Sequence, residues 1–194
     1  MRATKCLARR SIRLKEYDYG EPGSYFVTIC AYRHAYLFGT VRRGIMCANA
    51  YGRIVEQEWL ASPAIRDEVE IDAFVVMPNH VHGIIWIKTA NLAGAPGATA
   101  HDATPRGGSP RHVGAHGRAP LRKVGSAPYR PPRSLGSFVA GFKSACTKRI
   151  NVARGSPGVP VWQRNYYERV LRNEDELNAA RQYIIDNPTL WEDT

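Results

Sequence analysis

The chain has 194 residues, of which 44% are hydrophobic, and it carries a formal net charge of +10 at pH 7. This length suits one ordinary domain, and this apolar content excludes a chain that is disordered throughout. The positive charge bears on partners rather than on fold, and nucleic acid is the polyanion that such proteins most often bind. An anionic membrane is the rival partner, but no basic amphipathic helix with a continuous apolar face supports it.

The cysteines and the apolar runs bear on the cellular compartment. The four cysteines are too widely spaced to form a Cys-x-x-Cys pair, so neither a zinc finger nor a disulfide scaffold is indicated. The basic N-terminal residues are not followed by the apolar stretch of a secretory signal. The longest apolar runs are far shorter than a membrane span. We therefore expect a cytoplasmic protein with reduced thiols.

The first third of the chain predicts a strand, a hairpin partner and a helix. Residues 24–33 alternate in a way that suits a strand with both faces partly covered. Residues 41–47 are a candidate hairpin partner for this strand across a turn at Gly39. Residues 49–61 place apolar side chains on one helical face, and Pro63 just beyond them indicates the end of the helix.

Two further extended segments follow before the middle of the chain. Residues 71–77 form an apolar run rich in residues that favour strands, and residues 80–88 resume extended structure after Pro78-Asn79. Two strands that meet at so tight a turn indicate a β-hairpin.

Residues 91–133 differ sharply in composition from the rest of the chain. They contain seven Gly, seven Pro and seven Arg or Lys against one acidic residue, Asp102. Such a segment buries too little apolar surface to offset the entropy of ordering it. We predict a disordered basic insertion within a single domain, 1–194, that acts either as a solvated spacer or as a flexible arm that grips DNA.

Beyond the insertion the pattern is helix, strand, helix. Apolar residues repeat at helical spacing over 135–150, with Ser134 as a candidate N-cap. Residues 161–171 are aromatic and predicted to be extended. An Asn-Glu-Asp-Glu run from Asn173 resembles a capping box and begins a final helix that ends before Pro188. This order of elements predicts an α+β fold, a ferredoxin-like sandwich with a mainly antiparallel sheet and helices on one face.

Two histidines on one strand are the first candidates for chemistry. Successive side chains of a strand point to opposite faces, so His80 and His82 project from the same face and can converge on one metal ion. A His-x-His pair alone is weak evidence, because surface histidines are common, and the sequence leaves the metal site a hypothesis. Of the other histidines, three fall in the insertion and His34 has no partner nearby in sequence.

The final helix offers a second constellation. Tyr183 and Asn187 are four residues apart and therefore share one helical face. A tyrosine hydroxyl can attack phosphorus when a metal neutralises the phosphate, and an asparagine oxygen one turn away can be a further ligand of that metal. The alternative is that Tyr183 is an ordinary residue of an amphipathic helix, since spacing alone does not select one of ten tyrosines.

Taken together, these motifs resemble the REP-associated tyrosine transposases, which belong to the HUH single-tyrosine transposases and are related to the insertion-sequence-200-like enzymes. The resemblance rests on Val-Met-Pro-Asn-His-Val-His at 76–82, Trp-Gln-Arg-Asn-Tyr-Tyr-Glu-Arg-Val-Leu-Arg at 162–172, and Arg-Gln-Tyr-Ile-Ile-Asp-Asn-Pro at 181–188. The segments 9–14 and 23–30 fit the same family, so the resemblance covers nearly everything outside the insertion.

The resemblance implies roles for particular residues. His80 and His82 match the HUH metal ligands, Tyr183 matches the nucleophile, and Asn187 matches a polar ligand one turn later. The implied cofactor is Mg²⁺ or Mn²⁺, which polarises the scissile phosphate. The implied activity is DNA transposition or repeat mobilisation, in which hairpin-forming single-stranded DNA is nicked and rejoined through a 5′-phosphotyrosine. Arg169 departs from the pattern, because many relatives have histidine there, and the insertion is longer than expected.

Further basic residues are candidate phosphate contacts, the alternative being ordinary solvated charges: Arg9, Arg10, Arg13, Lys143, Lys148 and Arg164. The adjacent tyrosines 166–167 are expected to pack or to contact DNA. Two other functions stay open. One is a non-catalytic single-stranded DNA- or RNA-binding protein derived from a transposase, and the other is a metal-dependent hydrolase in which water is the nucleophile. We expect a monomer or a homodimer and no membrane partner.

Overall fold

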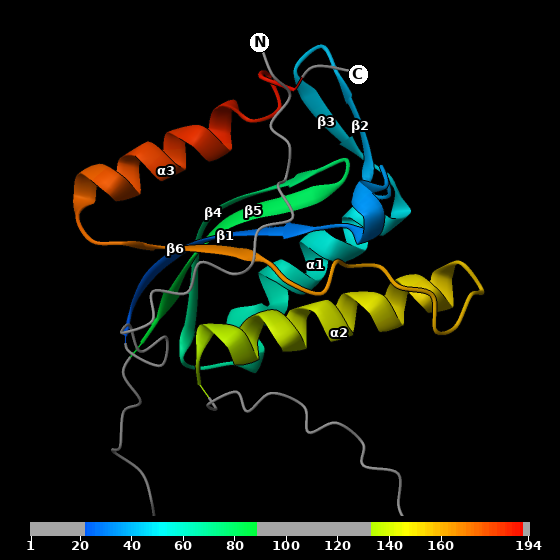
Figure 1. The fold of residues 1–194 in the computed structure, drawn as a ribbon, viewed down its shortest axis with the longest axis horizontal. Helices are drawn as coiled ribbons and strands as arrows, with labels where there is room; N and C mark the ends of the chain where they lie inside the picture. Colours follow the sequence, from blue (N-terminus) through cyan, green and yellow to red (C-terminus); the bar gives the residue numbers. More distant parts are fainter. Residues whose placement is uncertain (1–21, 89–132, 192–194) are drawn as a thin grey trace, which may run out of the picture. The chain divides into compact units, whose positions relative to one another are not determined.

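The computed structural model of the protein describes residues 22–88 and 133–191. Within these residues four strands form one antiparallel sheet in the order β4-β5-β1-β6 (Figure 1). The sheet strands are β1 (Gly23–Cys30), β4 (Val69–Met77), β5 (His80–Ile87) and β6 (Tyr167–Leu171). The helices are α1 (Ala50–Ile65), α2 (Leu135–Ala153) and α3 (Glu174–Asp186), with a short 3₁₀ turn, η1, at Tyr32–His34.

The α+β, ferredoxin-like fold class is confirmed. The sequence β1-α1-β4-β5-α2-β6 is the βαββαβ unit of that fold, and every pairing in the sheet is antiparallel. Helices α1 and α2 cover one face, where Trp59 of α1 meets Phe138 and Phe142 of α2 edge to face. Helix α3 lies on the opposite face, so the prediction that the helices all lie on one face is wrong. Both faces of the sheet are therefore covered.

The predicted pairing of residues 41–47 with the first strand is wrong. Both edges of β1 are taken, one by β5 and the other by β6. Instead β2 (Gly39–Arg42) and β3 (Ile45–Ala48) pair with each other in a separate two-stranded sheet. Their connection is the two-residue turn 43–44, in which both residues have positive φ, 52° and 73°. This is the type I′ geometry that matches the twist of a tight hairpin, and glycine at position 44 adopts it without strain.

Local capping explains where the helices begin. The Asn49 side chain accepts hydrogen bonds from the N–H groups of Tyr51 and Gly52 at the start of α1. Ser134 caps α2 in a reciprocal pair with Ser137, so the predicted N-cap is confirmed. Asn173 caps α3 as predicted, and it accepts its hydrogen bond from the backbone of the third helical residue.

The strand boundaries refine two other predictions. The hairpin of β4 and β5 across positions 78–79 is confirmed, with Met77 opposite His80. Of the predicted extended segment 161–171 only the last five residues join the sheet, as β6. Ahead of them, Trp162 makes an isolated bridge with Ala31.

Several predictions lie outside the described residues. The predicted insertion 91–133 lies outside them except for Arg133. The candidate phosphate contacts at positions 9, 10 and 13 also lie outside them. The described residues all belong to one compact unit of the chain. Within 22–88 and 133–191, no helix has the length and apolar character needed to cross a membrane.

Gly83 in β5 allows α1 to approach the sheet closely. A Cβ atom at this position would lie 2.2 Å from Cζ2 of the fully buried Trp59. We expect Gly83→Ala to lower the free energy of unfolding by roughly 1–3 kcal/mol, because overpacking forces a rigid ring to shift. Urea unfolding measures the change. Combining it with Trp59→Phe, which makes room, should cost less than the sum of the two single changes, and strict additivity would contradict this explanation.

Candidate functional site

The two histidines of β5 lie side by side on the face of the sheet that α3 covers. Their ring centroids are 4.4 Å apart, and their exposed fractions are 9% for His80 and 6% for His82. They pair across the sheet with Cys30 and Thr28 of β1. The alternation of side chains along the strand thus brings both imidazoles to one place, as the sequence predicted.

Each histidine is oriented through its Nδ1 atom. Nδ1 of His80 lies 2.6 Å from the Asn79 amide oxygen, which can only accept, so Nδ1–H donates and Nε2 keeps its lone pair. That Nε2 is buried and has no hydrogen-bond partner among the described residues. Nδ1 of His82 lies 2.8 Å from the Thr28 hydroxyl. Fixing one ring nitrogen in this way orients the other toward a ligand.

Both imidazoles are electrically neutral at pH 7. Burial, and secondarily the charge of nearby His34, lowers the pKa of His80 to about 4, and the Asn187 side chain acts weakly in the opposite direction. Burial lowers the pKa of His82 well below its ordinary value, and His80 adds to this effect. A neutral imidazole is the form that binds a metal ion, because its lone pair is free.

Helix α3 brings the two other candidates to the histidine pair. The Tyr183 ring lies 5.2 Å from the ring of His82 and 5.9 Å from that of Phe26, measured between centroids. Tyr183 is 41% exposed, so a substrate can reach it. Asn187 is buried at the C-terminal end of α3 and interacts with His80. Two segments that are distant in sequence therefore converge on one site.

Apolar packing and one ion pair hold α3 in place. Leu177 and Ile184 pack on the sheet against Phe26 and neighbouring apolar residues. The guanidinium of Arg181 donates to both carboxylate oxygens of Asp72, at 2.9 and 2.6 Å. Asp72 lies where the pairing of β4 with β5 shifts register, and 109 residues separate it from Arg181. The sequence did not predict this pair, since no local pattern connects the two positions.

We expect Asp72→Asn to lower the free energy of unfolding by about 1 kcal/mol at pH 7, a modest effect because solvent screens this partly exposed pair. The hydrogen bonds from Arg181 hold the pKa of Asp72 below its usual value. The stabilisation is therefore complete above that usual value and is lost as pH falls through the lowered pKa. Urea unfolding at pH 7 and below pH 4 should show the wild-type and variant curves converging at acid pH. Arg169→Gln, which removes an exposed pair with Glu176, is the control.

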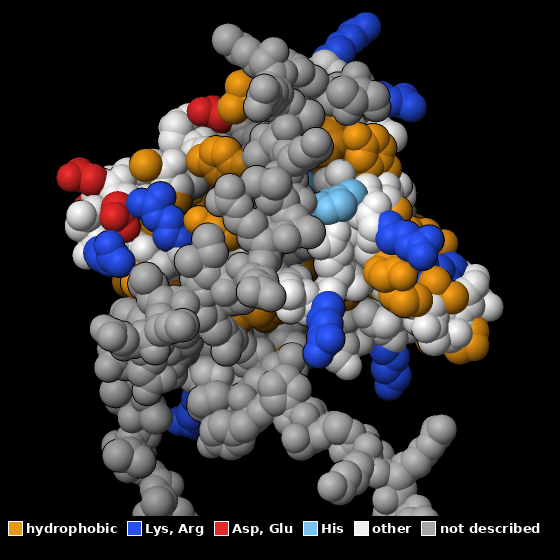
Figure 2. Space-filling model, in the orientation of Figure 1, with side chains coloured by type: hydrophobic (Ala, Val, Ile, Leu, Met, Phe, Trp, Pro, Cys, Tyr) orange, Lys and Arg blue, Asp and Glu red, His pale blue; other side chains and the backbone are white. Residues whose placement is uncertain are grey.

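The two described basic candidates on α2, Lys143 and Lys148, lie on the face of the sheet away from the histidines. Lys143 of α2 donates to the backbone oxygens of Gln163 and Asn165, at 2.9 and 3.0 Å, and so ties the helix to the segment before β6. Lys148, also on α2, and Arg164 are exposed. Helix α2 covers the face of the sheet opposite α3. Figure 2 shows Lys and Arg side chains spread among exposed hydrophobic ones, and DNA contact by these candidates stays a prediction.

The adjacent tyrosines differ from each other. Tyr166 is partly buried against the core, and Lys143 lies over its ring at 5.6 Å from the centroid. Tyr167 begins β6 and is 52% exposed. Among the described residues, neither of these two tyrosines makes a ring contact with His80 or His82, whereas Tyr183 contacts His82.

Two aromatic residues near the histidines were missed at the sequence level. The Trp191 ring lies 5.8 Å from that of His80, and the Tyr36 ring lies 5.7 Å from that of Trp191. Tyr36 belongs to the connection between β1 and β2, and Trp191 follows α3. Single aromatic residues outside a periodic pattern carry no signal that would have identified them.

The residues at the site fit a divalent ion. The buried, unpartnered Nε2 of a neutral His80, the adjacent His82 and the amide of Asn187 provide two nitrogen donors and one oxygen donor. Mn²⁺ accepts imidazole nitrogens together with oxygen atoms from a substrate or water more readily than Mg²⁺, which prefers oxygen ligands. No group of three or more His, Cys, Asp and Glu side chains gathers as a metal site within the described parts of the chain.

Comparison with known proteins places the fold in a definite class. The structure of the REP-associated tyrosine transposase bound to a REP hairpin aligns with 93% of this chain and 73% of that chain, at a TM-score of 0.53 and 17% sequence identity. The protein therefore has a transposase-like fold. No protein-family model matches the sequence. An uncharacterised protein of Haemophilus influenzae is 36% identical over 186 residues, 95% of this chain and 90% of that protein. The chain belongs to the same family as this Haemophilus protein.

Proposed function

We propose that the protein is a single-tyrosine, HUH-type DNA transesterase that nicks and rejoins single-stranded hairpin DNA. The observation that carries this proposal is the position of an exposed tyrosine, Tyr183, directly beside a pair of buried neutral histidines. The transposase that shares the fold was bound to a REP hairpin, which supports hairpin-forming repeats as the class of substrate. The net charge of +10 suits a polyanionic partner.

In the proposed reaction the Tyr183 oxygen attacks the scissile phosphorus and loses its proton. A bond forms between that oxygen and the 5′ phosphate of the downstream strand, while the bond between phosphorus and the upstream 3′ oxygen breaks. The leaving oxygen takes up a proton and becomes a 3′-hydroxyl. Rejoining is the reverse step with a 3′-hydroxyl as the attacking group. One phosphodiester linkage is exchanged for another, so no external energy source is needed.

The surrounding residues prepare this step. His80, His82 and Asn187 would hold the divalent ion, which supplies the charge that stabilises the phosphate during attack. Mg²⁺ prefers oxygen ligands, so two imidazoles favour Mn²⁺ of the two ions. Asn79 and Thr28 hold the imidazoles by their Nδ1 atoms. Packing of α3 on the sheet, together with Arg181 and Asp72, positions the tyrosine.

The formation of a covalent adduct tests the proposal. The full chain is incubated with single-stranded hairpin DNA that carries unpaired flanks, labelled at one end or the other, with Mn²⁺ or Mg²⁺. On a denaturing gel, the 3′-labelled strand should migrate with the protein, and the 5′-labelled strand should be released with a free 3′-hydroxyl. A chelator should prevent both. Binding without cleavage would favour a non-catalytic binding protein, and cleavage without an adduct would favour a hydrolase.

A further inference from the structure

Ring contacts form a continuous series across the candidate site. Tyr183 contacts His82 at 5.2 Å, His82 contacts His80 at 4.4 Å, and His80 contacts Trp191 at 5.8 Å. Trp191 contacts Tyr36 at 5.7 Å, with the rings inclined by 62°. After α3 the chain makes one more turn, in which the backbone N–H of Leu190 donates a hydrogen bond to the backbone oxygen of Asp186. This turn precedes Trp191, whose ring contacts His80. Tyr183 and Trp191 therefore lie at opposite ends of the histidine pair.

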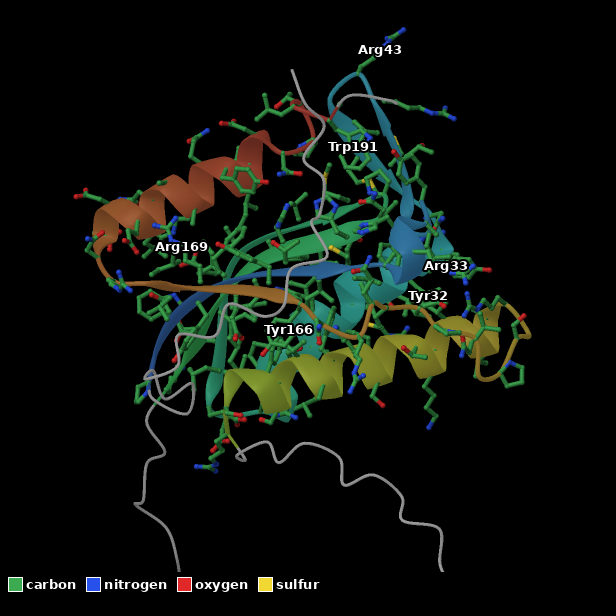
Figure 3. All side chains as sticks on the ribbon, viewed as in Figure 1. Tyr32, Arg33, Arg43, Tyr166, Arg169 and Trp191 are labelled. Carbon is green, nitrogen blue, oxygen red and sulfur yellow. The ribbon has the colours of Figure 1, made fainter. Side chains whose placement is uncertain are left out.

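The Trp191 end of the series is partly exposed and carries two exposed arginines, beside Asp186 at the end of α3. Tyr36 is 52% exposed. The turn of the β2–β3 hairpin borders this end, because Gly44 packs against Thr189, and Figure 3 shows Trp191 beside the hairpin that carries Arg43 at its tip. Arg42 and Arg43 are exposed, and no ion pair among the described residues engages them. The acidic residues in the first turn of α3 lie at the other end of that helix.

The geometry of in-line displacement indicates which part of the substrate lies at the Trp191 end of the site. The attacking and leaving oxygens of a phosphoryl transfer lie on opposite sides of phosphorus. With Tyr183 attacking from one end and the phosphate at the histidines, the leaving 3′ oxygen points toward Trp191. This oxygen belongs to the nucleotide on the 5′ side of the scissile phosphate.

We infer that Tyr36 and Trp191 form a stacking platform for the base of the nucleotide immediately 5′ of the scissile phosphate. The inference rests on the proposed function. Aromatic side chains stack single-stranded bases with little regard to sequence. The edge contact with Trp191 holds the Tyr36 ring in place, so its exposed face is ready for a base. Arg42 and Arg43 supply charge for the phosphates that continue upstream. The platform retains the strand that carries the free 3′-hydroxyl, which is the strand needed for rejoining.

The test compares two strands in a Tyr183→Phe background, in which binding is measured without cleavage. The scissile phosphate is first mapped with the wild-type protein. One oligonucleotide extends upstream of that phosphate, and the other begins at it with a 5′-phosphate. Tyr36→Leu should weaken binding of the extended strand roughly 5- to 150-fold, the range expected for one stacked base, and leave binding of the shorter strand unchanged. Tyr36→Phe should bind like tyrosine. Tyr32→Leu, which removes another exposed tyrosine near the same loop, is the control.

A scan with 2-aminopurine, which loses fluorescence when it stacks, locates the base independently. We expect quenching at the position 5′ of the scissile phosphate, abolished by Tyr36→Leu and kept in Tyr32→Leu. Quenching only on the 3′ side, or equal weakening of both strands, would overturn the assignment. If no adduct forms on any hairpin, the proposed function fails. A stacking role for Tyr36 is then judged by the scan alone, without reference to a scissile phosphate, and a scan in which Tyr36→Leu removes no quenched position rejects it.

Discussion

Tyr183→Phe should abolish the covalent protein–DNA adduct and leave the protein folded. The change removes one oxygen atom from a ring that is 41% exposed, while the ring contacts with His82 and Phe26 persist. Stability should change by no more than about 0.5 kcal/mol, as for other surface substitutions. The rate of adduct formation should fall at least about 10⁴-fold, because loss of a nucleophile removes the reaction path itself. Denaturing gels with 3′-labelled hairpin DNA and Mn²⁺ measure that rate.

The other conspicuous tyrosines provide matched controls. Tyr166→Phe and Tyr167→Phe should both retain the adduct. Tyr166 is partly buried against the core beneath Lys143, and Tyr167 stands on β6 without a ring contact to either histidine in the described contacts. An adduct that survives in Tyr183→Phe and disappears in one of these variants would move the nucleophile from α3 to the strand.

Local patterns in the sequence predicted much of the fold. Strand alternation placed His80 and His82 on one face, and the tight turn before them predicted the hairpin of β4 and β5. The capping residues Ser134 and Asn173 predicted where α2 and α3 begin, because a cap acts on N–H groups only two or three residues away. The order of elements was sufficient for the ferredoxin-like class.

Features that depend on distant residues could not be predicted in this way. Helix α3 packs on the face opposite α1 and α2, where three different strands present the apolar residues Phe26, Ile84 and Leu171. The pairing of residues 39–48 as a separate hairpin follows from the positive φ at Arg43 and Gly44, and an Arg-Gly turn is a weaker signal than Asn-Gly. The Lys143 ammonium donates hydrogen bonds to two backbone oxygens, and the amino-acid composition does not predict these contacts.

In the candidate site, too, some residues are predicted by short sequence motifs and others are brought close only by the tertiary structure. Its reactive groups fall in short motifs, and the spacing of Tyr183 and Asn187 needs only the helical period. The residues that support them come from elsewhere. Thr28 reaches His82 from the neighbouring strand β1, and Asp72 meets Arg181 from β4 at the edge of the sheet. Such partners are visible only when the sheet order is known.

Replacing either histidine should abolish metal binding and strongly slow nicking while hairpin binding remains. A divalent ion is worth several kcal/mol to the transition state, so His80→Ala and His82→Ala should each slow adduct formation about 10²-fold or more. Binding of uncleaved hairpin DNA should change little, because it depends mainly on phosphate contacts. Addition of Mn²⁺ should raise the thermal midpoint of the wild-type protein, since a ligand that binds only the folded state stabilises it. Neither variant should show this shift.

Variants of the orienting residues distinguish a metal site from a merely structural histidine pair. Thr28→Val and Asn79→Ala keep both imidazoles but remove the hydrogen bonds at Nδ1. Each should weaken Mn²⁺ affinity about 10- to 100-fold, the usual effect of losing such a partner, and high Mn²⁺ should restore nicking. Excess Mn²⁺ should not rescue His80→Ala. A histidine variant that still binds Mn²⁺ with wild-type affinity in a calorimetric titration would show that the pair is not the metal site.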